Sequence, residues 1–409
     1  MYIKQNKAPY RPDMKSLFAC IVLVFAIQNV WAQQEEPVVS DSIQAQVDIL
    51  DVVFKKRRDS VNQAKLQEEK KVYFSLMPLS SGSGGPNIAI SVVNASFHLG
   101  NAEDTKFSNV TLYPSTNLRT YFHLKAIPNL WLASNNWNIP GKLEFTQDAQ
   151  DNYGLGANTS EDSLFVIKYK LSRAHVSFNK RLVNHVYLGG GYALDYYYDI
   201  REESEADRQT DFDLYPYGTE GTSISSGLTV DMLIDSRVNP INPLEGVYVN
   251  LTLRVNPTWM GSDDLWYSMY LDTRKYINFS QEKHRVLAFW GLYWATYGEV
   301  PYLEMPASGM DFFGWTGRGY HRARFRGRQM VYTEAEFRFD FTPNGLFGGV
   351  VFANMQSELE EASQAFEYIK PAVGTGIRLK FNKFSDSNLT FDMGYGDGFN
   401  WYLGLNEVF

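Results

Sequence analysis

The chain has 409 residues, a formal net charge of −8 and 15% aromatic side chains, including 26 Tyr and 27 Phe. Its mean hydropathy of −0.31 excludes a protein built from membrane-spanning helices. Spanning β-strands are compatible with such an average, because each alternates lipid-facing and lumen-facing residues. Aromatic richness is typical of the girdles that barrels place at both membrane interfaces. A large soluble β-sandwich is the alternative, and it leaves the N-terminal segment unexplained.

The N-terminal segment has the pattern of an export signal. An apolar run, Leu17 to Ile27, is followed by Val30-Trp31-Ala32, which ends on the small residue of a cleavage site. The run is shorter than the roughly 20 residues that span a membrane as a helix. We therefore assign 1–32 to a signal peptide, with Met14 as an alternative start. The single cysteine, Cys20, lies within it, so we expect no disulfide in the mature chain.

Residues 33–72 are predicted to lie in the periplasm as a polar spacer and one amphipathic helix over 41–71. Asp41 or Ser42 is the expected N-cap. Apolar residues recur at helical spacing, at Ile43, Val47, Leu50 and Phe54. Two interpretations stay open: a periplasmic tether, which we favour, and a plug or docking helix for a partner.

The third region, 73–409, consists of short runs that alternate apolar and polar residues. The clearest runs are 246–256, 331–341, 369–380, 389–396 and 399–409. A period of two places alternate side chains on opposite faces of a strand. The polar faces carry charges and glycine, which suits a hydrated lumen, and the apolar faces suit lipid. Because only a closed barrel leaves no strand edge in lipid, we predict an all-β, transmembrane antiparallel β-barrel of about fourteen to sixteen strands, with a bulge near Ser172.

Four motifs lie along this region in a fixed order. They are Tyr153-Gly154-Leu155-Gly156; Asp235-Ser236-Arg237 with Asn239-Pro240 and Asn242-Pro243; Arg318-Gly319-Tyr320; and a terminal strand that carries Trp401 and ends on Phe409. With these motifs, 73–409 resembles the outer-membrane assembly-factor superfamily, the BamA/TamA-like bacterial surface-antigen barrels. The resemblance implies 16 strands, an Arg-Gly-aromatic motif in the sixth extracellular loop, and a terminal strand that assembly machinery reads as a barrel signal.

The resemblance also implies that Arg318 reaches from its loop into the lumen and pairs with polar groups of the barrel wall. A guanidinium is a rigid fork of donors suited to carboxylates. Relatives often place an Asp where this chain has Asn354. We therefore expect Asp392 as the partner of Arg318 in a latch, with Glu334 and Glu336 on the same lumen faces by parity. The alternative is an extracellular basic loop that binds glycolipid anions.

Two further sets of residues receive structural interpretations. The alternating arginines of the loop are expected to line one side of it as a solvated face toward lumen carboxylates; they are Arg322, Arg324, Arg326 and Arg328. Short polar side chains bond their own backbone in turns. We therefore predict a turn signature at Asp235, Arg237, Asn239 and Asn242.

The expected function follows from the resemblance, with one departure. Relatives usually carry periplasmic POTRA domains, whereas 33–72 has room only for a helix, so the chain resembles a POTRA-less branch. We expect an outer-membrane protein of a Gram-negative bacterium that acts in, or as an accessory to, protein insertion or translocation. A weak seam between 87–97 and 399–409 is the expected route. The alternative is a passive pore or structural barrel without clients.

The expected partners are outer-membrane lipid or lipopolysaccharide and, by resemblance, assembly subunits or client proteins. Catalysis is not expected, because Ser81-Gly82-Ser83-Gly84-Gly85 lacks the Gly-x-Ser-x-Gly of a nucleophile elbow. An outer-membrane lipase is therefore a weak third interpretation. The six His show no metal-ligand spacing. We expect no metal, no cofactor and no nucleic acid.

Overall fold

The computed structural model describes residues 46–53, 72–77, 88–89, 92–101, 104–106, 108–116, 121–203, 209–280, 285–383 and 386–409. All of them belong to one compact unit, Ser40–Phe409. No helix among these residues is long and apolar enough to cross a membrane. The signal peptide assigned to 1–32 and the glycine-rich turn at 81–85 lie outside the described residues.

Most of the unit is β-strand. The strands are β1 Val72–Met77, β2 Ile88–Ala89, β3 Val92–Phe97, β4 Ser108–Thr116, β5 Phe122–Trp131, β6 Trp137–Asn152, β7 Phe165–Val183, β8 Val186–Glu203, β9 Gly221–Asp235, β10 Gly246–Asn256, β11 Trp266–Asn278, β12 Arg285–Gly298, β13 Gln329–Asp340, β14 Phe347–Glu358, β15 Lys370–Asn382, β16 Ser387–Tyr395 and β17 Phe399–Leu405. The described helices are short: α3 Ile49–Val53, η1 Ala133–Asn135, η2 Glu161–Ser163, α5 Asp211–Leu214, η3 Thr258–Met260 and η4 Tyr302–Glu304.

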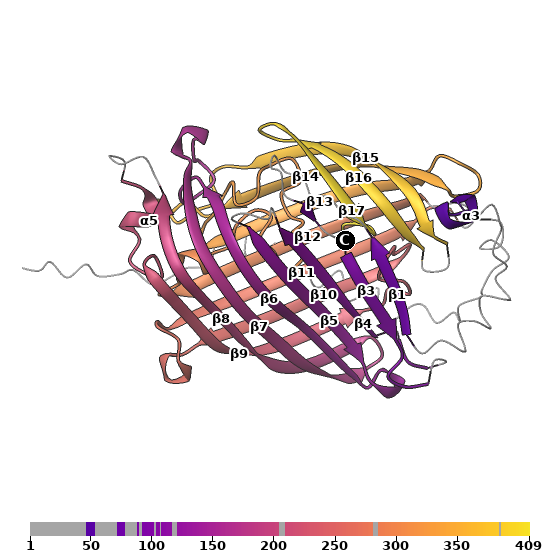
Figure 1. Cartoon of the computed structure of the whole chain (residues 1–409), viewed down its shortest axis with the longest axis horizontal. Coiled ribbons are helices and arrows are strands. Elements are labelled where there is room, and N and C mark those ends of the chain that lie inside the picture. The colour runs from indigo at the N-terminus through magenta and orange to yellow at the C-terminus, as the bar shows by residue number, and fades with distance from the viewer. Residues whose placement is uncertain are drawn as a thin grey trace, which may run out of the picture. The chain divides into compact units, whose positions relative to one another are not determined.

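The strands form one antiparallel ladder that curves into a barrel (Figure 1). Consecutive strands pair from β3 to β17, and β1 pairs with β3. Because β2 and β3 pair with successive parts of β4, they occupy one position, which gives sixteen positions in the ladder. The prediction of an all-β antiparallel barrel is confirmed. Pairing between β1 and β17 is not found among the described residues, so the ladder is open there.

That opening corrects the predicted seam. The sequence placed the first strand at 87–97, whereas β1 (Val72–Met77) precedes it and covers its edge. The barrel region is predicted to begin at residue 73, but the sequence does not settle how its first residues divide into strands; the structure makes Val72–Met77 the first of them. The candidate seam therefore lies between β1 and β17.

Burial in the barrel wall is reversed relative to a water-soluble protein. Along β6 every second residue from Glu144 to Asn152 is polar and buried, and the positions between them are exposed. The exposed face of this strand includes Leu143 and Phe145, with 46% and 54% of their surface accessible. Large exposed apolar surfaces are costly in water and are typical of the lipid-facing side of a barrel. The polar interior is therefore the place where a functional site is expected.

The two ends of the barrel differ in their connections. The long-connection end holds residues 299–328 between β12 and β13, and α5 between β8 and β9. The short-turn end holds tight connections such as 341–346, and α3 lies against it (Figure 1). In outer-membrane barrels the short turns face the periplasm and the longer loops face outward.

The N-terminal helix differs from the prediction of one helix over 41–71. Residues 46–48 are not helical, and the helix begins at Ile49. The reason is Asp48, whose Oδ1 accepts a bond from Asp51 N at 2.9 Å and so caps the helix. Lys383 fixes this helix to the β15–β16 turn by donating from Nζ to Asp51 Oδ2 at 2.7 Å. The predicted caps, Asp41 and Ser42, lie outside the described residues.

The bulge predicted near Ser172 is present in β7, but at a different position. The pairing of β7 with β8 shifts between Lys168 and Lys170. The change of phase in the sequence indicated the irregularity, but the position of a bulge depends on the partner strand as well.

Candidate functional site

Residues 299–328, here called the lumen loop, run inside the barrel between β12 and β13. Asp311 organises its outer turn. The carboxylate accepts bonds from four consecutive backbone N–H groups, from Phe313 to Thr316, at 2.8–3.2 Å. This turn presents Gly317, Arg318 and Gly319 to the barrel wall. The loop is thus a folded element with its own hydrogen bonds.

Arg318 lies among three carboxylates of the wall. Its Nη1 donates to Asp392 Oδ2 at 2.8 Å, and its Nη2 donates to Glu336 Oε2 at 2.5 Å. Glu334 receives bonds from both Nε and Nη2. The guanidinium is 1% exposed. The structure therefore brings together Arg318 and all three residues that the sequence named as partners.

Two further arginines complete this cluster. Arg338 Nε donates to Glu336 Oε1 at 2.6 Å, and Arg378 Nη1 donates to Asp392 Oδ1 at 2.5 Å. Burial alone lowers the pKa of Arg318, but the adjacent carboxylates hold that pKa well above its usual value. Buried charges are tolerated when they are paired and hydrogen-bonded. Removing Arg318 would leave Glu334 without a cationic partner in the interior.

Asn354 serves the loop in a way that an aspartate would not. Its Nδ2 donates to the backbone oxygen of Arg318 at 2.9 Å and lies 3.4 Å from Glu334 Oε2. Both neighbours are acceptors, so an amide donor is required at this position. The amide thus adds a donor to a site that already holds three carboxylates.

Gly319 and Tyr320 pack against the last strands of the barrel. Gly319 has a φ of 109°, and a Cβ there would stand 2.7 Å from Ala372 Cβ. Its N–H donates to Tyr402 Oη at 2.9 Å, and its oxygen accepts from Asn400 Nδ2 at 3.0 Å. Tyr320 Oη donates to Pro371 O at 2.6 Å. The Arg-Gly-Tyr tip is thus in direct contact with β17, which borders the open seam.

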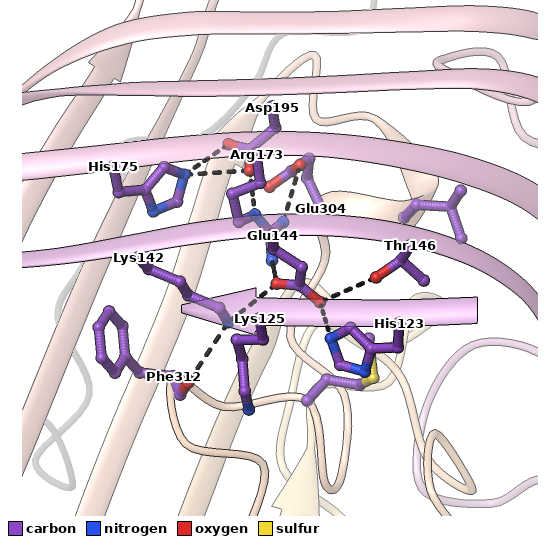
Figure 2. Close-up of polar contacts among 12 residues, drawn as sticks. His123, Lys125, Lys142, Glu144, Thr146, Arg173, His175, Asp195, Glu304 and Phe312 are labelled. Atoms are coloured by element: carbon purple, nitrogen blue, oxygen red, sulfur yellow. Dashed lines mark hydrogen bonds and ion pairs between the residues drawn. The ribbon is translucent and has the colours of Figure 1, made fainter. Parts of the chain in front are cut away.

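The opposite side of the lumen loop is held by lysines. Lys142 Nζ donates to Phe312 O at 3.3 Å, and Lys125 Nζ donates to Phe313 O at 3.4 Å. Lys142 also pairs with Glu144 at 3.4 Å. Figure 2 shows Lys142 between Glu144 and Phe312 of the loop, with Lys125 beside it. These long bonds to neutral carbonyls are weaker than the ion pairs of Arg318.

Behind the lysines lies a second network of charges (Figure 2). Asp195, fully buried, accepts from Arg173, from His175 Nε2 at 3.0 Å and from Arg254 Nη1 at 2.5 Å. Arg173 reaches the loop at Glu304, 3.4 Å away. Burial, followed by the charge of Asp195, raises the pKa of Glu304 to about 7. This side therefore contains a loop carboxyl that titrates near neutrality.

The four alternating arginines do not form one solvated face. Arg322 pairs with Asp148 of β6 at 3.0 Å, whereas Arg324 pairs with Asp397 of the β16–β17 turn at 3.0 Å. Arg326 is buried and donates to backbone oxygens of the loop itself. The prediction fails because this part of the loop turns, with Ala323 at a φ of 58°, instead of extending.

The predicted turn residues lie at the end of β9 and in the β9–β10 connection. Arg237 donates to both oxygens of Asp235, at 2.9 and 3.1 Å. Asn239 Oδ1 accepts from Ile241 N at 2.9 Å, and Asn242 Nδ2 donates to Asp386 at 3.1 Å. Their contacts are with the backbone and with neighbouring turns of the short-turn end.

The end of the sequence departs from its predicted face. Trp401 is exposed on the outer face, but Phe409 is 2% exposed and lies in the interior against Trp290. The sequence assigned both to one lipid-facing strand. The strand ends at Leu405 because Asn406 turns the backbone with a φ of 68°.

Several residues of the site escaped the sequence reading. They are Asp148, Asp311, Lys125, Lys142 and Glu407. A signal was available for Asp148, since polar residues occupy every second position from Glu144 to Asn152. The described residues show no group of His, Cys, Asp and Glu arranged to hold a metal ion.

Together, the fold and site define an antiparallel β-barrel whose lumen contains an arginine-anchored loop. Residues 108–404 match the Omp85 superfamily domain. The chain belongs to the Omp85 superfamily. A search among curated proteins finds no significant match.

Three solved structures are similar in fold. CdiB from Acinetobacter baumannii is 12% identical with a TM-score of 0.51, over 82% of this chain and 59% of that one. BamA from Haemophilus ducreyi, lacking POTRA domains 1–3, is 14% identical with a TM-score of 0.49, over 88% and 82%. CdiB from Escherichia coli is 10% identical with a TM-score of 0.49, over 87% and 72%. At these identities the likeness concerns the fold alone.

Proposed function

We propose that this chain acts in, or as an accessory to, the insertion or translocation of proteins at the outer membrane of a Gram-negative bacterium. The carrying observation is the tip of the lumen loop, where Arg318 pairs with three wall carboxylates and Gly319 contacts β17. The contact links the loop to the strand beside the open seam. Membership of the Omp85 superfamily supports this function over other barrel functions.

In this proposal Arg318 is a latch and the seam is the site that meets a client. The latch keeps the loop inside the barrel, and the loop in turn supports β17 through Asn400 and Tyr402. An unpaired strand edge is a template for pairing with another strand. The edges of β1 and β17 are therefore the surfaces that a client strand would meet. The partners are client proteins, assembly subunits and the surrounding lipid.

The test is in-cell photo-crosslinking from the two edge strands. A probe at Ser75 in β1 and one at Leu403 in β17 should capture identified outer-membrane barrel proteins or assembly subunits. A probe at Leu253 in β10, whose side chain is exposed on the outer face, is the matched control and should capture neither. Equal capture at all three positions would remove the support for a seam-specific role.

A passive pore is the competing function, and the lumen loop argues against it. The loop bonds to both β5–β6 and β13–β17 and so crosses the lumen. We expect low and intermittent conductance in planar bilayers. High, steady conductance, together with normal outer-membrane protein levels after depletion, would favour the pore instead.

A further inference from the structure

The last residues of the sequence leave the sheet and enter the barrel. Pairing of β16 with β17 ends at Leu389 and Leu405, after which Asn406 N donates to Asn388 O at 2.8 Å. Glu407 N then donates to Ile241 O, in the β9–β10 turn, at 3.4 Å. The segment Glu407–Phe409 thus crosses the short-turn end of the lumen, held mainly through its side chains.

Glu407 is bound by two arginines and one amide. Arg378 Nε donates to Glu407 Oε2 at 2.8 Å, and Arg338 Nε lies 3.7 Å from the same oxygen. Asn388 Nδ2 donates to Oε1 at 2.9 Å. Two guanidinium groups and an amide are a donor set that selects a carboxylate.

Phe409 fills an aromatic pocket two residues further on. Its ring lies 5.3 Å from that of Trp290 and 6.4 Å from that of Tyr276. The Arg338 guanidinium lies 5.3 Å from the ring centroid, and its Nη2 donates to Phe409 O at 2.8 Å. Val408, between the two anchors, is also buried. The pocket therefore matches an acidic–apolar–aromatic sequence.

The pocket also retains unused binding capacity. Arg338 Nη1 is buried and has no hydrogen-bond partner among the described residues. The same arginine lines a cavity of about 20 Å³ together with Arg378, Lys380 and Glu407. That volume is close to one water molecule, and it lies beside a donor that the segment leaves unused.

We propose that these walls, here called the tail pocket, form a binding site for an acidic–apolar–aromatic peptide segment. The pocket consists of Tyr276, Trp290, Arg338, Arg378 and Asn388. Glu407–Phe409 is its internal occupant and keeps it closed to other segments. A second segment of the same chemistry displaces it.

A displaced Glu407–Phe409 segment could continue β17 along β16. The register of β16 and β17 ends at Leu389 and Leu405. Continued beyond that pair, it would place Asn406 opposite Asn388, to which its N–H already donates, and Glu407 opposite Ser387, the first residue of β16. Release would therefore allow β17 to lengthen along β16. The edge strand beside the seam would grow at the moment when the pocket receives its ligand. This inference does not depend on the identity of the clients.

The first experiment measures peptide binding to the whole purified chain in detergent. The probe is a fluorescent, amidated peptide, Leu-Asn-Glu-Val-Phe. In the variant E407Q/F409A, we expect it to bind about tenfold more tightly than in the unaltered chain, because the pocket is no longer occupied from within. A control peptide with Gln for Glu and Ala for Phe should bind neither the variant nor the unaltered chain. L403A, on β17 outside the pocket, is the matched control and should bind like the unaltered chain.

A second experiment leaves both anchors in place. V408C introduces a thiol at a buried position of the segment, and maleimide labelling should accelerate several-fold when the peptide is added. The control peptide should leave the rate unchanged. If E407Q/F409A folds and binds the peptide no better than the unaltered chain, the proposal is wrong. Labelling of V408C that ignores the peptide would also overturn it.

Discussion

The two sides of the lumen hold the same loop by different means. At the β13–β17 side, one arginine meets three carboxylates, and the backbone of Gly319 touches the wall directly. At the β5–β6 side, Lys125 and Lys142 donate long bonds to backbone carbonyls, and the partly exposed Arg322 pairs with Asp148 at 3.0 Å. The first side holds the loop through a cluster of buried charges, and the second through bonds to neutral carbonyls and a single, more exposed ion pair to β6.

This difference teaches where specificity lies. A buried charge cluster is costly to break, because a carboxylate that loses its cation, here Glu334, is left uncompensated. A lysine that binds a neutral carbonyl leaves little behind when it is removed. Changes at the Arg318 side should therefore move the whole loop, and changes at the lysine side should act locally. The following experiments test that contrast, from the largest expected effect to the smallest.

Arg318→Ala should have the largest effect. It leaves Glu334 without a cationic partner and takes one of two arginines from Glu336 and from Asp392, and removing one partner of a buried pair costs roughly 3–5 kcal/mol. We expect a lower unfolding temperature of the purified barrel, read from its heat-dependent shift on gels.

Lys125→Met, at the lysine side, is the comparison for Arg318→Ala and should cost less than about 1 kcal/mol, because Lys125 bonds a neutral carbonyl. Adding E334Q to Arg318→Ala should restore part of the loss, since the charge left without a cation is removed. Equal losses in Arg318→Ala and Lys125→Met would break the contrast between the sides.

Gly319→Ala should have the second-largest effect on stability. The new Cβ would stand 2.7 Å from Ala372 Cβ, on a backbone with a φ of 109°. Gly261→Ala is the matched control, because its φ is 97° and nothing lies within 4 Å of its Cβ position. Both variants share the backbone strain. The difference between their unfolding free energies, about 1–3 kcal/mol from overpacking, therefore reports how closely Gly319 approaches β15. Equal unfolding temperatures for the two variants would contradict this packing.

Asn354→Asp should have the third-largest effect on stability. It removes the donor to Arg318 O and places a charge about 3.4 Å from Glu334. We expect a loss of roughly 1–3 kcal/mol in unfolding free energy.

Asn129→Asp in β5 is the control for Asn354→Asp, since Asn129 Oδ1 accepts a bond from Asn138 and a carboxylate preserves that role. A neutral result for Asn354→Asp would show that the donor is not required. Unfolding in urea, followed by tryptophan fluorescence, measures both variants.

The smallest effect concerns pH at the lysine side. Burial, followed by the charge of Asp195, raises the pKa of Glu304 to about 7 from an ordinary value of 4.5. The folded state therefore binds more protons than the unfolded state between these values, and stability falls as pH rises from about 4.5 through 7.

Glu304→Gln should flatten that pH dependence, as seen in unfolding temperatures measured from pH 4.5 to 8. E299Q, which replaces an exposed carboxylate near the same end of the loop, should leave the dependence unchanged. A slope that survives in Glu304→Gln would assign the titration to another group.

The sequence by itself determined the class of the molecule. Period-two alternation predicts the barrel and the polar lumen, because side chains of a strand must alternate between faces. The Arg318 motif and strand parity also selected Glu334, Glu336 and Asp392 as candidate partners. Parity suffices for these residues because it fixes the face on which a side chain lies.

Only the tertiary structure decided which residues on a face meet. Contacts across the lumen depend on the register of many strands and on how the barrel curves, and no local pattern contains either. Asn354 therefore emerged as a donor to the loop backbone only in three dimensions. Phe409 left its predicted face because the turn at Asn406 and the pocket beside Trp290 outweigh strand continuation. The first strand of the seam was placed at 87–97 because strand order depends on pairing, and only the pairing of β1 with β3 shows that β1 lies outside it.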